Sequence, residues 1–277
     1  MSEMKHPPTP PQEPWQVAED AERRTALRET LYGSATRQML AAAAIKPGDH
    51  VLDIAAGTGD QSRMAARLVG PTGSVLATDI SPEMLAVAAR FAEQEGLSML
   101  TTRAMNAEQL DLPENSYDAV ISRLGLMLIP DQQRALTEIR RVLKPGGRLA
   151  ALVWSTSERN PLFTLDTTIM AKYLGEAAEQ RDDAFSLADV AVFASALTEA
   201  GLQQVQVEPV ALTTFSFPSF EVLANWWGSS LEQALAQLEP EVRQRAQAEI
   251  RQAVRPFEGP HGIQAPAEVL LGAGMKE

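Results

Sequence analysis

The sequence predicts an α/β protein built on a parallel sheet, and two observations carry that prediction. From residue 50 onward, short apolar runs alternate with helical patterns at the spacing of βαβ units. The first run, Val51–Ile54, leads into a glycine-rich turn, and a helical pattern follows at once. With 277 residues, 45% of them hydrophobic, the chain is long enough to bury the large core that such a sheet needs.

The elements are predicted in chain order from these patterns. Residues 1–14 contain five prolines and are expected to form a flexible tail, and residues 15–44 are helical with an interruption near Tyr32-Gly33-Ser34. Strands are predicted at residues 50–54, 74–78, 99–104, 117–122 and 148–154, with helices at 59–68, 82–95 and 131–143. Ser81 followed by Pro82 is a helix N-cap signal.

The pattern changes after Trp154. We expect helices up to about residue 175 and over 188–200, a strand over 204–217, helices over 219–238 and 240–254, and a last strand over 268–274.

Composition excludes several classes of function. The net charge of −12 argues against a nucleic-acid surface, which needs clustered Lys and Arg. The absence of cysteine rules out disulfides, thiolate nucleophiles and cysteine-based metal sites, and the three histidines are too scattered to suggest a metal site. No apolar run reaches 18 residues and the N-terminus lacks a signal-peptide core, so we expect a cytoplasmic protein that does not insert into a membrane.

The turn Gly57-Thr58-Gly59 indicates a nucleoside site. It lets the backbone approach a ligand closely and directs helix N-terminal amides at it. Asp79 ends the next strand, about 20 residues further on, where a carboxylate can accept hydrogen bonds from ribose hydroxyls. Such an acid can also simply cap a helix, but its position after the turn favours the nucleoside interpretation.

Four stretches together resemble one family. Val51–Asp60, Ala77–Leu85, Asn106–Glu108 and Leu143–Arg148 match, in order and spacing, the motifs of class I S-adenosylmethionine-dependent methyltransferases. The resemblance is closest to the methyltransferases of ubiquinone and menaquinone biosynthesis and covers residues 48–155. Each motif alone is weak, but the four together are specific.

The resemblance implies a doubly wound sheet with strand order 3-2-1-4-5-7-6 and an antiparallel last strand. Because that strand begins at the edge where the parallel strands end, residues 218–263 must cross the active-site face. We therefore expect a core of residues 45–217 and 264–277, with the N-terminal helices 15–44 and the insertion 218–263 acting as a lid over the acceptor.

The resemblance also implies a role for particular residues in binding S-adenosylmethionine. Asp53 and the turn Ala55–Gly59 would hold the methionine portion, Asp79 the ribose, Ile80 the adenine face, and Asn106 or Ala107 the adenine edge. The full expected cofactor set is Asp53, Ala55, Gly57, Thr58, Gly59, Asp79, Ile80, Met84, Asn106, Ala107, Glu108 and Arg123, the last through its backbone carbonyl. One departure is Ala55, which stands where many members have the first glycine.

The acceptor should bind beyond the strand ends, in a pocket rich in aromatic residues. The candidate lining residues are Trp15, Tyr32, Leu124, Trp154, Asn225, Trp226 and Trp227. Trp226 and Trp227 are about 100° apart on a helix, so one is expected in the core and one in the pocket. His261 and Tyr32 are candidate catalytic residues, although each could equally be structural.

The leading hypothesis is a methyltransferase that acts on a small aromatic or enolisable acceptor, with C- or O-methylation. One alternative is an NAD(P)-dependent oxidoreductase. It is disfavoured because Ser62 stands at the third position of the dinucleotide fingerprint and Asp60 would place a carboxylate beside a pyrophosphate. The other alternative is a non-catalytic nucleoside-binding module on the same fold.

Overall fold

The computed structural model describes residues 14–174, 182–212 and 215–277; of residues 14–23, 182, 183, 229, 230 and 233 it describes the backbone alone. Its main sheet has seven strands in the order β3-β2-β1-β4-β5-β10-β6. The strands are β1 (His50–Ile54), β2 (Ser74–Asp79), β3 (Leu100–Ala104), β4 (Tyr117–Arg123), β5 (Leu143–Trp154), β6 (Gln203–Ala211) and β10 (Glu268–Met275).

Neighbouring strands from β3 to β5 are parallel, and β10 runs antiparallel between β5 and β6. As β10 is the seventh strand of this sheet along the chain, the order 3-2-1-4-5-7-6 and the antiparallel last strand are confirmed. The start of β10 pairs with the end of β5, at Val269 and Trp154. The segment before β10 therefore arrives at the edge where the parallel strands end.

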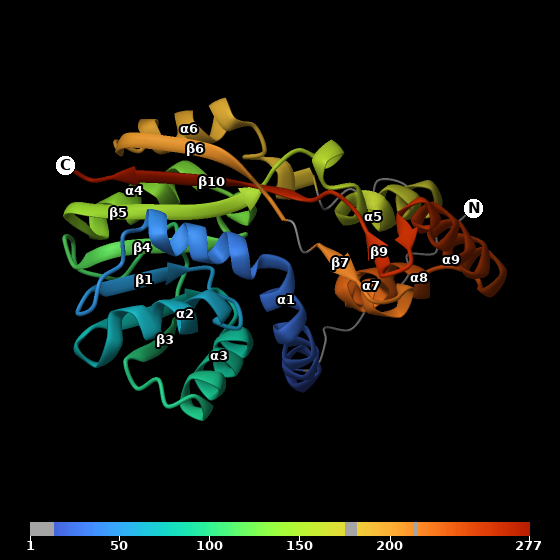
Figure 1. Ribbon diagram of the computed structural model, residues 1–277, viewed down its shortest axis with the longest axis horizontal. Helices are drawn as coiled ribbons and strands as arrows, with labels where there is room; N and C mark the ends of the chain where they lie inside the picture. The colour runs from blue at the N-terminus through green and yellow to red at the C-terminus, as the bar shows by residue number, and fades with distance from the viewer. Residues whose placement is uncertain (1–13, 175–181, 213–214) are drawn as a thin grey trace, which may run out of the picture.

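Helices cover both faces of the sheet (Figure 1). The helices are α1 (Pro14–Ala42), α2 (Asp60–Val69), α3 (Pro82–Gln94), α4 (Gln132–Val142), α5 (Pro161–Leu174), α6 (Val190–Glu199), α7 (Phe220–Trp227), α8 (Ser229–Ala236) and α9 (Pro240–Val254). α1, α2 and α3 contact one another on one side, and α4 and α6 pack on the other. The core between these layers contains fully buried aliphatic residues such as Leu52, Ile121 and Leu149.

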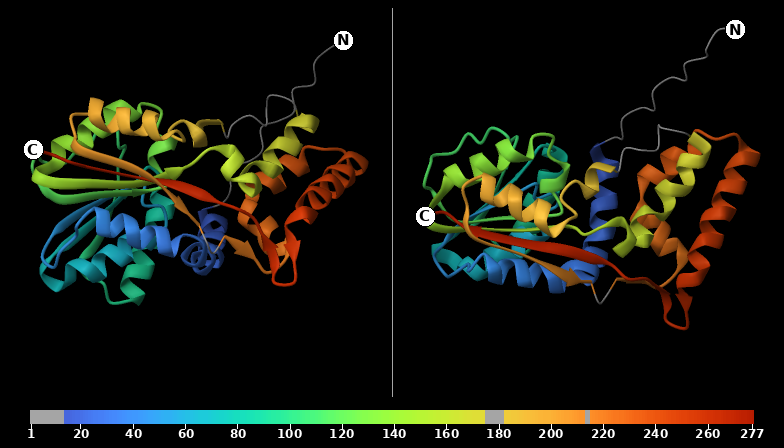
Figure 2. Two further views of the ribbon diagram at one scale, coloured as in Figure 1. Left: turned by 45° about the horizontal axis from the view of Figure 1, so that its top comes forward. Right: turned by 90° about the horizontal axis from the view of Figure 1, so that it is seen from above.

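Helices α5, α7, α8 and α9 form a second group beyond the strand ends, with α5 packed on α8 and α9 (Figures 1 and 2). A small sheet of β7 (Ser216–Phe217), β9 (Gly262–Gln264) and β8 (Glu258–Gly259) lies with them. The N-terminal part of α1 lies between this helical group and the main sheet (Figure 1).

Several sequence predictions about these elements are wrong in detail. α1 is one continuous helix through Gly33 and Ser34, although it bends along its length (Figure 1). The strand expected over 204–217 is divided between two sheets. The helix expected over 219–238 is split into α7 and α8 at Gly228, whose φ of 74° is left-handed. Except for Pro14, the first residue of α1, the proline-rich segment 1–14 lies outside the described residues.

In the described part of the chain, no helix is both long and apolar enough to cross a membrane.

Candidate functional site

A cavity of about 400 Å³ opens where the ends of the parallel strands face the helical group. It is bounded by α1, the turn after β1, the segment after β4, the end of β5, and residues of α5 and α7. The lining residues are Arg24, Arg28, Tyr32, Ala55, Ala56, Gly57, Thr58, Asp60, Gln61, Met84, Arg123, Leu124, Met127, Leu128, Trp154, Phe163, Ala184, Trp226 and Trp227.

The glycine-rich turn forms one end of this cavity and is held by backbone geometry. Ala55, Gly57 and Gly59 all have positive φ angles, of 53°, 56° and 75°. Because the left-handed region favours glycine, the alanine at position 55 is strained. A Cβ on Gly59 would lie 2.9 Å from the Cβ of Ala88 on α3, so the turn also needs glycine for close packing.

Asp53 supports the turn from behind and is not among the residues that line the cavity. Its side chain is completely buried, and its carboxylate accepts hydrogen bonds from Gln61 Nε2 (3.1 Å) and the Ser62 hydroxyl. Burial raises the pKa of Asp53 to about 7, against the opposing effect of these two hydrogen bonds. Asp53 therefore fixes the first turn of α2, and through it the shape of the cavity wall.

Gln61 presents an acceptor without a donor. Its Nε2 donates to Asp53 Oδ1 and to the Ala56 carbonyl (3.3 Å), which fixes the orientation of the amide. Its Oε1 is buried at the cavity wall and has no hydrogen-bond partner. An unpaired buried acceptor is costly, so this atom marks a place for a ligand that donates a hydrogen bond.

Asp79 and the residues expected around the nucleoside lie beside the cavity. The backbone N–H of Gly57 donates to Asp79 Oδ2 (2.8 Å), and that of Ser81 donates to Oδ1 (3.0 Å). Each carboxylate oxygen retains a lone pair for a further donor. Ile80 is next to it and 79% exposed, which is unusual for a large aliphatic side chain.

Residues 106–108, the third segment expected at the nucleoside, form a turn. Asn106 is exposed, and its Oδ1 accepts from the N–H of Glu108 (2.9 Å). Glu108 accepts from the N–H of Asp131 (3.1 Å) at the start of α4, while Ala107 between them is half-buried. The carboxylate of Glu108 is thus engaged in holding α4.

An arginine cluster links α1 to the turn. Arg28 donates through Nε to Asp60 Oδ2 (2.6 Å) and through Nη2 to the Thr58 hydroxyl (2.5 Å). Arg123, at the end of β4, donates to the same Oδ2 (3.0 Å), and Arg63 reaches Oδ1 (3.5 Å). Burial alone would raise the pKa of Asp60, but Arg28, Arg123 and Arg63 outweigh it and hold that pKa below its usual range.

Aromatic side chains form the other end of the cavity. Trp154 lies with its ring centroid 4.6 Å from that of Phe163 and 6.0 Å from that of Tyr32. Trp226 contacts Phe163 at 5.8 Å. Both Trp226 and Trp227 line the cavity, as the candidate list has them, and Trp227 is at the same time the buried core residue that the helix geometry leads us to expect. Trp227 is also anchored, because its indole N–H donates to the Leu162 carbonyl (2.8 Å).

Tyr32 belongs to this wall through α1 and is almost fully buried. Burial raises its pKa to about 12, although a hydrogen bond from Trp226 and the charges of Arg123 and Arg28 act in the opposite direction. The hydroxyl is therefore protonated at neutral pH and can donate a hydrogen bond.

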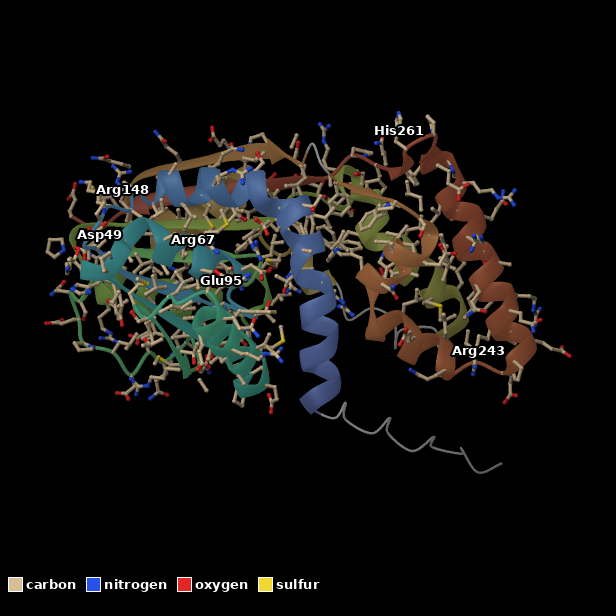
Figure 3. The ribbon with its side chains drawn as sticks, turned by 60° about the horizontal axis from the view of Figure 1, so that its bottom comes forward. Asp49, Arg67, Glu95, Arg148, Arg243 and His261 are labelled. Carbon is tan, nitrogen blue, oxygen red and sulfur yellow. The ribbon has the colours of Figure 1, made fainter. Side chains whose placement is uncertain are left out.

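Two sequence candidates, Asn225 and His261, are not brought to the cavity, and the side chain of a third, Trp15, lies outside the described residues. Asn225 faces a separate groove between α7, α8 and α9. His261 is an exposed residue in the turn between β8 and β9, and Figure 3 shows it at the outer edge of the helical group. The backbone of Trp15 lies in the first turn of α1, and its side chain is outside the described residues.

Sequence reasoning missed Arg24 and Arg28. Both precede Tyr32 at intervals of four residues, which places all three on one face of α1. Once Tyr32 is a candidate, this spacing is a usable signal. Gln61, Phe163 and Ala184 carried no comparable signal, because their place in the cavity depends on packing.

Known proteins similar to this chain match it mainly over the part that contains the glycine-rich turn. The family model described as "Methyltransferase domain" matches residues 51–147. The ubiquinone/menaquinone biosynthesis C-methyltransferase UbiE of Bordetella parapertussis is 38% identical over 175 residues, which are 59% of this chain and 67% of that protein. The chain belongs to the class I S-adenosylmethionine-dependent methyltransferase family.

Another relative is matched over a smaller share of its length. UbiE of Pseudoalteromonas translucida is 41% identical over 127 residues, 46% of this chain, and the chain spans about half (51%) of that relative. Among solved structures, a putative methyltransferase from Bacillus halodurans is similar in fold, with a TM-score of 0.59, 22% identity, and coverage of 88% of this chain and 99% of that chain. As a class I methyltransferase fold, the architecture gives no support to the oxidoreductase alternative.

Proposed function

We propose that the protein transfers a methyl group from S-adenosylmethionine to a small planar acceptor with an apolar or aromatic body, by C- or O-methylation. The observation that carries the proposal is the single cavity that has the glycine-rich turn at one end and the aromatic wall at the other. A donor bound at the turn and an acceptor bound at the aromatic wall would meet inside the same cavity.

The residues at the turn fit the methionine end of the cofactor. That end carries an ammonium group, and Gln61 Oε1 is a buried acceptor that lacks a donor. It also carries a carboxylate, for which the guanidinium of Arg28 at Thr58 and the backbone of the turn are suitable partners. The polar end of the cofactor thus finds a complementary group on each side.

The residues beside the cavity fit the nucleoside end. Asp79 would accept hydrogen bonds from the ribose hydroxyls, and exposed Ile80 would pack on the adenine face. Asn106, Ala107 and Glu108 would form the far border of the adenine site, and Met84 would lie near the turn, where its Cε is already close to Gly57.

Tyr32, Leu124, Trp154, Trp226 and Trp227 would hold the acceptor. When bound, S-adenosylmethionine supplies a methyl group that is already activated by the sulfonium. The protein then has to align the acceptor within about 3 Å of the methyl carbon and exclude water. Rings at several angles around one space can hold a planar body in one orientation.

We further propose that α1 and residues 218–263 act as the lid over the acceptor. Arg28 connects α1 to the turn, and Trp226 and Trp227 bring α7 to the opposite side of the same cavity. Closing these two elements on a bound pair of ligands would shield the reaction from solvent.

The proposal is tested with purified protein, S-adenosylmethionine labelled in its methyl group, and a panel of small phenols and enolisable ketones. The expected result is labelled, organic-extractable product together with binding of S-adenosylhomocysteine. Binding of NADH in place of S-adenosylhomocysteine would support the oxidoreductase alternative. Persistent failure to transfer label despite cofactor binding would support the non-catalytic module.

His261→Ala serves as the matched control in this assay. Because His261 is exposed and distant from the cavity wall, the variant should retain wild-type turnover and cofactor affinity. A specific loss of turnover in this variant would restore His261 as a candidate general base.

A further inference from the structure

The aromatic end of the cavity is equipped with hydrogen-bond donors. It is formed by the rings of Tyr32, Trp154, Phe163, Trp226 and Trp227. All of these except Phe163 bear a polar hydrogen, which is a hydroxyl on the tyrosine and an indole N–H on each tryptophan. Because an indole nitrogen can donate a hydrogen bond but cannot accept one, these groups limit which chemistry a ligand can present at this end.

Two of the four donors have an acceptor inside the protein. The indole N–H of Trp227 donates to the Leu162 carbonyl (2.8 Å), and the indole of Trp226 donates to the hydroxyl oxygen of Tyr32. A hydroxyl that accepts along one direction donates its own proton along another. The bond from Trp226 therefore turns the proton of the Tyr32 hydroxyl away from Trp226.

The other two donors lack an acceptor within the part of the chain that the structure describes. No described oxygen accepts a hydrogen bond from the Tyr32 hydroxyl or from the indole N–H of Trp154. Tyr32 is nevertheless only 5% exposed and Trp154 only 3%, and their ring centroids lie 6.0 Å apart. Buried tyrosines and tryptophans usually find a partner for their polar hydrogen, and leaving one unpaired costs free energy. These two neighbouring donors therefore mark a place for an oxygen that a ligand supplies.

Side chains that could accept a hydrogen bond from a ligand lie at the opposite end of the cavity. Among the described lining residues, the carboxylate and amide side chains are those of Asp60 and Gln61, both in the first turn of α2. At the aromatic end, the side-chain oxygen is that of Tyr32, which already accepts from Trp226. A ligand hydroxyl at this end would bring a further donor to a group of donors, whereas a carbonyl oxygen, which only accepts, complements them.

Tyr32 stands where the two ends of the cavity meet. Arg28, which lies four residues earlier on the same face of α1, donates to the Thr58 hydroxyl in the glycine-rich turn. One turn of an α-helix advances by about 5.4 Å, so Tyr32 follows this contact with the turn closely. The guanidinium carbon of Arg123, at the end of β4, lies 5.7 Å from the centroid of the Tyr32 ring. The hydroxyl of Tyr32 is thus placed to hold the part of an acceptor that faces the methyl donor.

We propose that the hydroxyl of Tyr32 donates a hydrogen bond to a carbonyl oxygen of the acceptor, and that the acceptor is a planar ketone and not a phenol. This inference rests on the proposed methyl transfer and narrows its acceptor class. A ketone oxygen has two lone pairs, so the indole N–H of Trp154 can donate to it as well. The bonds from Trp226 to Tyr32 and from Tyr32 to the ketone run in one direction, and each polarises the next. Tyr32 would thereby select the ketone and fix its orientation towards the methyl group.

The first test uses three compounds on one ring skeleton: 1-indanone, which is a ketone, 4-indanol, which is a phenol, and indane, which has no oxygen. Each is titrated calorimetrically into wild type and Tyr32→Phe, both saturated with S-adenosylhomocysteine so that no methyl group is transferred. Tyr32→Phe removes the hydroxyl and keeps the ring. It should weaken the binding of 1-indanone by about two- to tenfold, the effect of one net hydrogen bond, and change that of indane and 4-indanol by less than about twofold.

The second test reads the hydrogen bond directly, because the infrared stretching frequency of a carbonyl falls when its oxygen accepts one. 1-Indanone labelled with carbon-13 at the carbonyl should absorb at a lower frequency when bound to wild type than when bound to Tyr32→Phe. Trp226→Phe removes the N–H that orients the hydroxyl and should give an intermediate frequency. Tyr173→Phe is the matched control, because the Tyr173 hydroxyl donates to Glu249 outside the cavity, and it should behave as wild type.

Equal carbonyl frequencies in wild type and Tyr32→Phe would overturn the ketone proposal, as would failure of 1-indanone to bind the loaded protein or a selective loss of 4-indanol binding in Tyr32→Phe. If Tyr32→Phe does not fold, a wild-type frequency equal to that of 1-indanone in hexane overturns it. Calorimetric titration with S-adenosylhomocysteine alone separates these outcomes from failure of the proposed function. If S-adenosylhomocysteine binds, only the ketone proposal fails; if it does not bind, the methyltransferase proposal itself is contradicted.

Discussion

The two ends of the cavity are built in different ways. At the glycine turn, the wall is mainly backbone: left-handed residues and main-chain amides, one of which, the N–H of Gly57, donates to Asp79 beside the cavity. At the aromatic end, the wall is side chains contributed by α1, β5, α5 and α7, which are far apart in the chain. The first end depends on local conformation, whereas the second depends on how separate elements pack.

Because of this difference, the two ends should tolerate different substitutions. A backbone-built site fails when a Cβ is added or a hydrogen-bond acceptor is removed, even if the core stays intact. A site built by packing fails when a ring is removed, and the loss of that ring also destabilises the fold. Substitutions at the two ends should therefore differ in how strongly they change stability and cofactor affinity.

Trp154→Ala should have the largest effect on stability. Trp154 is almost fully buried at the end of β5, where its ring contacts Tyr32, Phe163 and Phe215. Its loss should lower the free energy of unfolding by about 3–5 kcal/mol in chemical denaturation. Leu128→Ala is the matched comparison, because Leu128 lines the same cavity but is 58% exposed, and its loss should cost less than about 0.5 kcal/mol. Equal effects would show that Trp154 is not a packing centre.

Gly59→Ala should be next in size and should act at the turn. The φ of 75° strains any other residue, and the added Cβ would meet Ala88 at 2.9 Å. We expect a loss of about 1–3 kcal/mol in the free energy of unfolding and a weakened affinity for S-adenosylhomocysteine. Gly96→Ala has a similar φ of 67° with nothing within 4 Å of the new Cβ, so it should be milder and leave cofactor affinity unchanged. The reverse order of severity would contradict the role given to the turn.

The same difference between the two ends determines which features could be predicted from the sequence. The turn and the position of Asp79 at the end of β2 were predictable, because each depends on a short stretch of sequence, and the strand order followed from the resemblance to class I methyltransferases. Tyr32 and Trp154 were predictable as candidates from strand and helix positions. Phe163 and Ala184 were not, since only the packing of α5 and the following segment against the strand ends brings them there. The split of the expected helix at Gly228 could likewise not be predicted, because the helical periodicity of the sequence continues across that glycine.

Asp53→Asn should have an effect that depends on pH and that is smallest at acidic pH. The pKa of Asp53 rises from 3.8 to about 7 in the folded protein, so folding favours the protonated carboxyl. That contribution is complete below about pH 4 and is lost as the pH rises through 7. Asparagine is neutral throughout, so the Tm of wild type relative to Asp53→Asn should fall between about pH 4 and pH 7, by about 2–4 °C for each kcal/mol lost. A constant difference between the two proteins would show that Asp53 does not titrate in this range.

If the cavity has a donor end at the glycine turn and an acceptor end at the aromatic wall, a substitution at one end should leave binding at the other end unchanged. Calorimetric titration with S-adenosylhomocysteine of Asp79→Ala and Trp226→Ala tests it most directly, with Asp111→Ala as an exposed acidic control. Because Asp79 would lose charge-assisted hydrogen bonds worth about 1.5–3 kcal/mol, its variant should bind at least about tenfold more weakly. Trp226→Ala and Asp111→Ala should bind within about twofold of wild type. Unchanged affinity in Asp79→Ala, or an equal loss in Trp226→Ala, would contradict the account.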